Sequence, residues 1–158
     1  MNKFVFIQMK PTKTFLSLTD PQKKSRFICF SNKNTADVFV DYVTSFRSKH
    51  GYWPAMDMSQ KFKTIKSKTG IKKRSPEELK EYLSYETFDF EQIDEMAKRS
   101  NISYLHVTNF TYIPNGEDNQ VVSFSGQEWD GQADDLKYRD LLEFNLKTKW
   151  INVSCILP

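Results

Sequence analysis

The sequence predicts a single α+β domain in which an antiparallel sheet carries its helices on one face. Short segments rich in Phe, Val, Ile and Tyr alternate with turn residues, which is typical of strands. Other segments carry helix caps or a 3.6-residue apolar spacing, and they are grouped between two sets of strands. With 158 residues, 39% of them hydrophobic and 15% aromatic, the chain is long enough for one core. We therefore assign residues 1–158 to one domain.

Three short strands are expected at the N-terminus: Lys3–Met9, Thr14–Leu18 and Ser25–Phe30. Pro11 interrupts the apolar pattern between the first two, and Asp20-Pro21 does so between the second and the third. These segments predict a three-stranded meander.

A helix is expected from about Ala36 to Lys49. Ser31–Thr35 offers several capping residues, and the sequence His50-Gly51 followed by Pro54 ends the helix. The apolar positions recur at the i, i+3, i+4, i+7 spacing of one helix face: Phe39, Tyr42, Val43 and Phe46. This face is expected to cover the sheet.

Two more helices are indicated by residues that cap a helix N-terminus. Ser75-Pro-Glu-Glu78 places a capping Ser before a Pro at the first helical position and predicts a helix to about Leu83. Asp89-Phe-Glu-Gln92 predicts another, to about Arg99.

The C-terminal third predicts more strands. Ile102–Ile113 alternates apolar and polar residues, and Gln120–Ser125 follows a Pro-Asn-Gly turn as its partner. Residues 134–155 fit either a helix over Asp134–Asn145 or a hairpin ending near Cys155, and we favour a short helix followed by a hairpin.

The charge of the chain is divided between its halves. Met1–Arg74 contains 16 Lys or Arg against four Asp or Glu, whereas Ser75–Pro158 contains seven against 16. The net charge of +3 hides this asymmetry. A division of this size points to charged partners rather than to a particular reaction.

The positive charge is concentrated in a basic connector, residues 55–74, which is expected to be extended or mobile. From Lys61 to Arg74, seven of 14 residues are cationic and none is acidic. We assign these cations as partner-binding residues: Lys61, Lys63, Lys66, Lys68, Lys72, Lys73 and Arg74. The partner is an acidic protein surface or, in the alternative interpretation, nucleic-acid phosphates. Lys61–Ile65 also fits an edge strand guarded by lysines, and the acidic half of the same chain is a further candidate for neutralising the connector.

A second candidate surface is the acidic loop expected over Gly126–Asp135. Its partner-binding residues are Glu128, Trp129, Asp130, Asp134 and Asp135. Carboxylates suit a hard cation, but the EF-hand pattern is absent, so a basic protein partner is the favoured interpretation. Trp is a common residue at the energetic centre of interfaces.

No catalytic, cofactor or metal site is predicted. No nucleophile elbow, HExxH, CxxC, P-loop or GxGxxG motif occurs, and His50 and His106 are the only imidazoles. Glu78-Leu-Lys80 matches the end of a nuclease pattern but falls in a predicted helix instead of the strand that this chemistry requires. Cys29 and Cys155 lie in apolar runs and are expected to be buried free thiols.

A non-catalytic interaction or assembly protein is therefore the favoured function, with other protein subunits, of its own kind or another, as partners. The Lys, Asn and Phe bias suits an AT-rich genome such as that of a large DNA virus or phage, so a minor structural or capsid component fits. A nucleic-acid-binding protein is the alternative, and a small hydrolase or nuclease is third. No long apolar run and no signal-peptide pattern is seen, so an intracellular, cytoplasmic or virion-associated location is expected, with no membrane partner and no small-molecule substrate.

Overall fold

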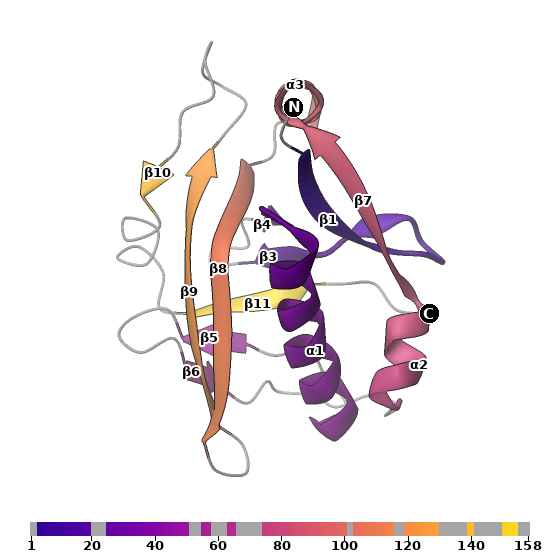
Figure 1. The fold of residues 1–158 in the computed structure, drawn as a ribbon, viewed down its shortest axis with the longest axis vertical. Coiled ribbons are helices and arrows are strands. Elements are labelled where there is room, and N and C mark those ends of the chain that lie inside the picture. The colour runs from indigo at the N-terminus through magenta and orange to yellow at the C-terminus, as the bar shows by residue number, and fades with distance from the viewer. Residues whose placement is uncertain are drawn as a thin grey trace.

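The computed structural model describes the backbone of residues 3–19, 25–50, 55–57, 63–65, 74–100, 103–115, 119–129, 139–140 and 150–154. Figure 1 shows helices arranged around a curled sheet, so the chain combines helices and strands as the sequence predicts. The described helices are α1 (Lys33–His50), α2 (Pro76–Glu81) and α3 (Phe90–Ser100). The described strands are β1 (Lys3–Met9), β2 (Thr14–Phe15), β3 (Ser17–Thr19), β4 (Ser25–Phe30), β5 (Ala55–Asp57), β6 (Lys63–Ile65), β7 (Leu83–Asp89), β8 (Ser103–Asn115), β9 (Asn119–Trp129), β10 (Arg139–Asp140) and β11 (Trp150–Ser154).

The first and third N-terminal strands have the predicted bounds, whereas the second is divided at Leu16 into β2 and β3 and ends at Thr19 instead of Leu18. The Leu16 amide donates to the carbonyl of Ile7 at 2.8 Å, and its carbonyl accepts from the amide of Ile28 at 3.5 Å. Its side chain is fully buried. Leu16 thus lies between two pairings, since β2 joins β1 and β3 joins β4.

The helix caps match the sequence. Asn32 Oδ1 accepts from the Thr35 amide at 2.9 Å at the start of α1. Ser75 caps α2, and at α3 the Gln92 amide donates to Asp89 Oδ1 while Gln92 Oε1 accepts from the Asp89 amide, each at 2.9 Å. These contacts satisfy backbone donors that a helix N-terminus leaves without intrahelical partners. The predicted apolar face of α1 is buried: Phe39, Tyr42, Val43 and Phe46.

The sheet is mixed, which corrects the prediction of an antiparallel sheet. β4 and β8 run parallel, in register from Arg26↔Ser103 to Phe30↔Val107, whereas the other described pairs are antiparallel. Parallel neighbours need a crossover, and here the chain passes through three helices between β4 and β8. The pairings form a closed circuit through β4, β8, β9, β6, β5, β11 and β3, and β1 with β7 extends from β4.

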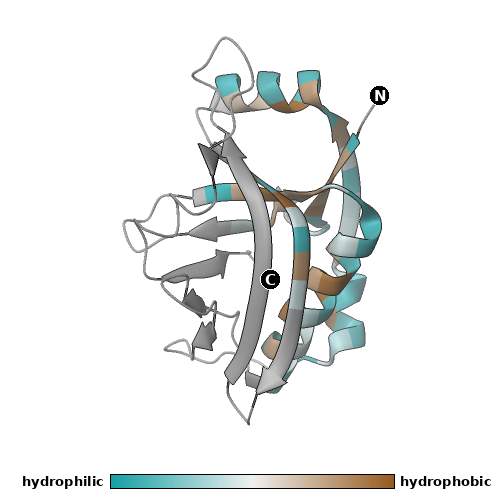
Figure 2. Ribbon diagram, turned by 60° about the vertical axis from the view of Figure 1, so that its left-hand side comes forward, coloured by the Kyte–Doolittle hydropathy of each residue, from teal (hydrophilic) through white to brown (hydrophobic). Residues whose placement is uncertain are grey.

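The helices lie on both faces of the sheet, which corrects the prediction of a single covered face. Val5 and Ile7 of β1 belong to the core beneath α1, whereas Phe4 and Phe6 belong to the core that contains Ile93 of α3. Figure 2 shows the two helices with apolar segments on the strands between them. Successive side chains of a strand point to opposite faces, so the unbroken run Phe4–Ile7 requires two apolar coverings.

β7 is a strand that the sequence pattern does not predict. It pairs antiparallel with the whole of β1, from Lys3↔Asp89 to Met9↔Leu83, and α2 ends at Glu81 just before it. Its pairing partner lies about 80 residues away in sequence, so tertiary context decides its conformation.

Other segments also differ from the elements that the sequence predicts. The region predicted as a connector contains β5 and β6, and β6 pairs with both β5 and β9, so Lys63–Ile65 is not an edge strand. Arg139–Asp140 forms β10 instead of a helix, and β11 pairs with β3 and β5 instead of closing a terminal hairpin.

Candidate interaction surface

The structure describes two of the seven cations predicted to bind a partner. Lys61, Lys66, Lys68, Lys72 and Lys73 lie outside the described residues. The backbone of Lys63 belongs to β6, where it pairs with Asp57 and Val121. Of these seven residues, only Arg74 has a described side chain.

Arg74 is engaged with α2. Its Nη1 donates to Glu78 Oε1 at 3.3 Å and to the Tyr82 hydroxyl at 2.7 Å, and the guanidinium lies 5.0 Å from the centroid of the Tyr82 ring. The side chain is only 13% exposed. Burial, and then the nearby charge of Arg74, lower the pKa of Arg47 on α1. Arg74 is therefore held against α2 and its C-cap residue Tyr82.

The predicted acidic loop is in part a strand. Gly126–Trp129 continues β9, where Trp129 pairs with Tyr104 and Glu128 pairs with both Leu105 and Arg139. Asp130, Asp134 and Asp135 lie outside the described residues. The loop prediction is wrong for residues 126–129, because the antiparallel pairing of β9 with β8 continues from Val107↔Gly126 to Tyr104↔Trp129.

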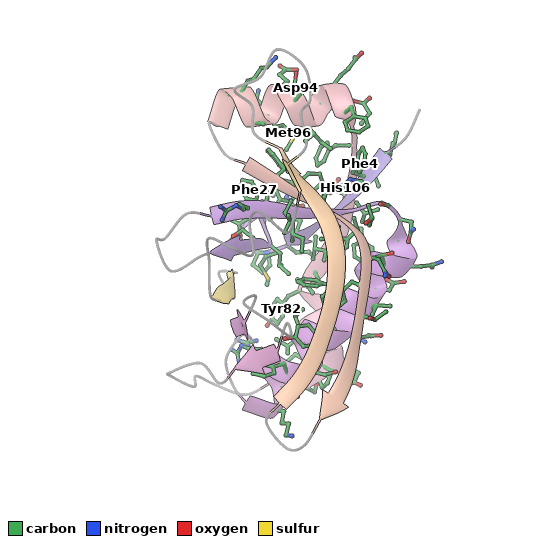
Figure 3. All side chains as sticks on the ribbon, turned by 90° about the vertical axis from the view of Figure 1, so that its left-hand side faces the viewer. Phe4, Phe27, Tyr82, Asp94, Met96 and His106 are labelled. Atoms are coloured by element: carbon green, nitrogen blue, oxygen red, sulfur yellow. The ribbon has the colours of Figure 1, made fainter. Side chains whose placement is uncertain are left out.

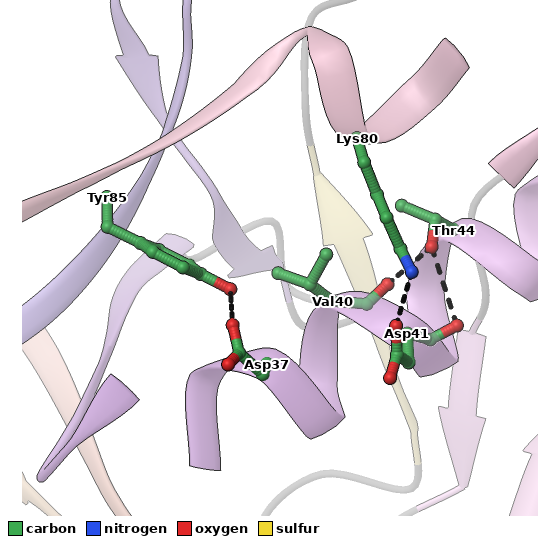
Figure 4. Close-up of polar contacts among 6 residues, drawn as sticks. All are labelled: Asp37, Val40, Asp41, Thr44, Lys80 and Tyr85. Atoms are coloured by element: carbon green, nitrogen blue, oxygen red, sulfur yellow. Dashed lines mark hydrogen bonds and ion pairs between the residues drawn. The ribbon is translucent and has the colours of Figure 1, made fainter. Parts of the chain in front are cut away.

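A polar groove lies where α1, α2 and β7 meet, and none of its residues was predicted as a site (Figure 4). Its volume is about 430 Å³. The lining residues are Asp37, Val40, Asp41, Lys80, Leu83, Ser84 and Tyr85. Val40 and Leu83 are buried at its floor, whereas the two carboxylates and the ammonium group are exposed.

Two polar contacts cross this groove. The Tyr85 hydroxyl donates to Asp37 Oδ1, and Lys80 Nζ lies 2.5 Å from Asp41 Oδ1. Burial raises the pKa of Tyr85, and the hydrogen bond and charge of Asp37 raise it further, so the phenol remains a donor. Lys33 Nζ lies 5.8 Å from the centroid of the Tyr85 ring. The groove therefore presents two carboxylates near two cations and a fixed hydroxyl.

One sequence signal points to this groove. Asp37 and Asp41 are four residues apart on α1, where like charges share a face and destabilise an isolated helix slightly. Such a pair favours a cation from another element, and Lys80 of α2 supplies it. Tyr85 could not be placed, because β7 itself was not predicted.

A polar contact outside the groove resembles a catalytic Ser–His pair. Ser31 Oγ, at the junction of β4 and α1, lies 2.8 Å from His106 Nε2 on β8. His106 points to the face opposite Leu105 and Val107, and the Phe4 ring packs against it in a T-shaped pair with centroids 4.5 Å apart (Figure 3).

Burial makes this pair unsuited to acid–base chemistry. It lowers the pKa of His106 to about 4, so the imidazole is neutral but a weak base at neutral pH. The residue is 9% exposed, and its ring packs against that of Phe4. The Ser31–His106 contact thus satisfies buried polar groups where β4, β8 and α1 meet.

The other residues that the sequence singles out form no further chemical site in the described part of the chain. Cys29 is a buried free thiol, as predicted, and burial raises its pKa well above the usual value, whereas Cys155 lies outside the described residues. Glu78 and Lys80 lie on α2, the helix predicted for them. In the described part of the chain, no three His, Cys, Asp or Glu residues gather as metal ligands, and no helix has the length and apolar character to cross a membrane.

No family model, curated protein or solved structure matches this chain. Its function is therefore inferred from its own residues and their arrangement.

Proposed function

We propose that this protein is a non-catalytic interaction or assembly protein that joins protein subunits through complementary charges. The contact would bring the basic segment Lys61–Arg74 of one molecule to an acidic surface of another. Contacts of this head-to-tail kind can extend into rings or larger assemblies, as a minor structural component of a particle requires.

The arrangement of the acidic elements supports this proposal. α2, β7 and α3 follow one another at the border of the fold formed by β1 and β7, and Arg74–Arg99 carries eight carboxylates against four cations. β6, which contains Lys63, is held between β5 and β9 in another part of the circuit (Figure 1). The acidic elements α2, β7 and α3 therefore lie at a border of the described fold, where a second molecule, as well as the chain's own cations, can approach them.

Sedimentation velocity at low and high salt tests the proposal. Self-association or association with a basic partner subunit should weaken as salt rises, because exposed charges are screened beyond about 10 Å at 0.1 M. Replacing Lys72 and Lys73 by Glu should lower the association constant by about tenfold. The matched control replaces Lys10 and Lys13, exposed residues at the β1–β2 turn, with the same change in charge. Equal losses in the two variants would contradict a specific role for the basic segment.

The alternative, nucleic-acid binding, predicts a different measurement. Affinity for a mixed DNA and RNA pool would fall linearly with the logarithm of salt concentration. Salt-dependent binding that is lost in the Lys72/Lys73 variant, without any protein assembly, would replace the assembly proposal with this one.

A further inference from the structure

We infer that the outer edge of β7 is a docking site for an extended, Lys- or Arg-rich segment of a partner protein, which adds to the sheet as an antiparallel strand. The inference rests on the proposed function and identifies one surface and the chemistry of its partner.

The edge of β7 is the first observation. β7 pairs with β1 along all seven residues, and in the described part of the chain no second strand pairs with it. Figure 1 shows β7 on the outer side of β1, between α2 at one end and α3 at the other. Every second N–H and C=O group of such a strand points outward and is a template for another strand.

β7 has only the acidic side chains of Glu86 and Asp89 to protect its edge, and these repel an acidic strand but not a basic one. Its sequence, Leu-Ser-Tyr-Glu-Thr-Phe-Asp, contains neither Lys nor Pro, and its seven pairs with β1 show no bulge. Short length, lysines, prolines and bulges are the features by which natural sheets prevent edge pairing. The strand is therefore long and regular enough to accept a partner.

The negative charge around β7 favours a basic partner strand. Three of the four cations between Arg74 and Arg99 are in ion pairs within the fold: Arg74 with Glu78, Lys80 with Asp41 and Lys98 with Asp94. Glu86, at the centre of β7, is exposed. Antiparallel pairing of two β7 strands about their centre would place Glu86 opposite Glu86, and like charges in that position are destabilising. A second copy of β7 is thus disfavoured, whereas a basic strand is favoured.

The groove gives the added strand a specific contact. Leu83 and Tyr85 pair with Met9 and Ile7 and so face α1, where Asp37 and Asp41 lie. Alternate side chains of an added strand would lie over the same face. A Lys or Arg beside Tyr85 would place its methylene groups against Leu83 and its charge near the two carboxylates, where it would share Asp41 with Lys80 and lie near Lys33.

Amide hydrogen exchange measured by NMR on the intact chain tests the inference directly. The probe is a blocked ten-residue peptide of alternating Lys-Lys and Val-Thr pairs, which places lysines on both faces of an extended strand, and the control peptide has Glu in place of each Lys. The Lys peptide should slow exchange at alternate residues of Leu83–Asp89, saturably and less strongly at high salt, because only outward N–H groups gain partners. The Glu peptide should have no effect.

Matched variants separate strand pairing from general attraction. Glu86→Lys should lower the affinity for the Lys peptide by about tenfold, and the loss should exceed that of Glu95→Lys, an exposed residue of α3 with the same charge change. Glu86→Pro and Thr87→Pro each remove one backbone N–H group, and these two groups point to opposite edges of β7. One variant therefore loses a donor to β1, whereas the other keeps the β1 pairing and loses a donor at the outer edge. Binding should be weakened in the variant that remains folded.

Three outcomes would overturn the inference: binding without protection of Leu83–Asp89, equal losses in Glu86→Lys and Glu95→Lys, or a homodimer formed through β7. If salt-dependent assembly persists in Glu86→Lys, the proposed function stands and its surface lies elsewhere. If assembly is absent in the unaltered protein while the Lys peptide protects β7, the docking edge stands and the assembly proposal fails.

Discussion

Two polar contacts made at the start of α1 differ in their surroundings. Ser31 reaches inward to His106, whose ring is buried against Phe4, whereas Asp37, about two turns further along the chain, reaches outward to Tyr85 at an open groove. Both join α1 or its N-terminal junction to a strand. In the buried region Ser31 Oγ and His106 Nε2 satisfy each other within the fold, whereas in the open region Asp37 and the Lys80-paired Asp41 have exposed side chains that a partner can reach. Burial, more than residue type, therefore decides which contact serves the fold and which can serve binding.

The largest expected effect comes from opening the buried region with Phe4→Ala. Phe4 is 5% exposed and packs edge-on against His106 and against Phe90, with ring centroids 4.5 and 4.6 Å apart. Its removal should lower the free energy of unfolding by about 3–5 kcal/mol, measured by urea denaturation. It should also raise the pKa of His106 toward its ordinary value, because water reaches the imidazole. The control is Val38→Ala on the exposed side of α1, which should change stability by less than about 0.5 kcal/mol.

The pH dependence of stability tests the same region. Well above about pH 6.5, the ordinary pKa of an imidazole, His106 is neutral in both the folded and the unfolded chain. As the pH falls from there to about 4, the unfolded chain takes up a proton that the folded chain excludes, so stability falls. The free energy of unfolding lost through this one group should reach about 3 kcal/mol near pH 4. His106→Gln should remove that part of the pH dependence, and a variant that keeps the full slope would show that other groups cause it.

The same comparison explains how far the sequence could predict this molecule. Local signals were sufficient for α1, in which Phe39 and Phe46 are buried as their helical spacing predicts, and for the helix caps at Ser75 and Asp89. They were also sufficient for the β8–β9 pairing. In each case the deciding contacts lie within a few turns or across one hairpin.

Features that depend on distant contacts were not predicted. β7 becomes a strand because β1 pairs with it, and the parallel pairing of Cys29 with His106 depends on where the chain returns after three helices. The run Phe4–Ile7 did contain a signal, because apolar residues on both faces of a strand imply coverings on both sides. The groove combines residues of α1, α2 and β7, so it could be found only once β7 was in place.

Removing one hydroxyl at a time compares the two contacts directly. Ser31→Ala leaves the buried His106 Nε2 without this partner and should cost about 1–3 kcal/mol of unfolding free energy. Tyr85→Phe removes a hydrogen bond at the half-buried edge of the groove and should cost about 0.5–1 kcal/mol. Urea denaturation of both variants at pH 7 measures the difference. A larger loss in Tyr85→Phe would mean that the groove contact, and not the buried pair, holds α1 to the sheet.

The smallest effect on stability, and the most direct link to binding, is expected for the Lys80–Asp41 ion pair. Its two side chains are 45% and 54% exposed, so a double-mutant cycle with Lys80→Met and Asp41→Asn should give a coupling below about 1 kcal/mol that declines with salt. Lys80→Met leaves both groove carboxylates to an incoming cation and should strengthen binding of the Lys peptide by about twofold to fivefold, as measured by calorimetry. Asp41→Asn should weaken it by a similar factor. If Lys80→Met weakens binding instead, the ammonium group belongs to the docking surface, and the partner must then offer an acceptor at that position.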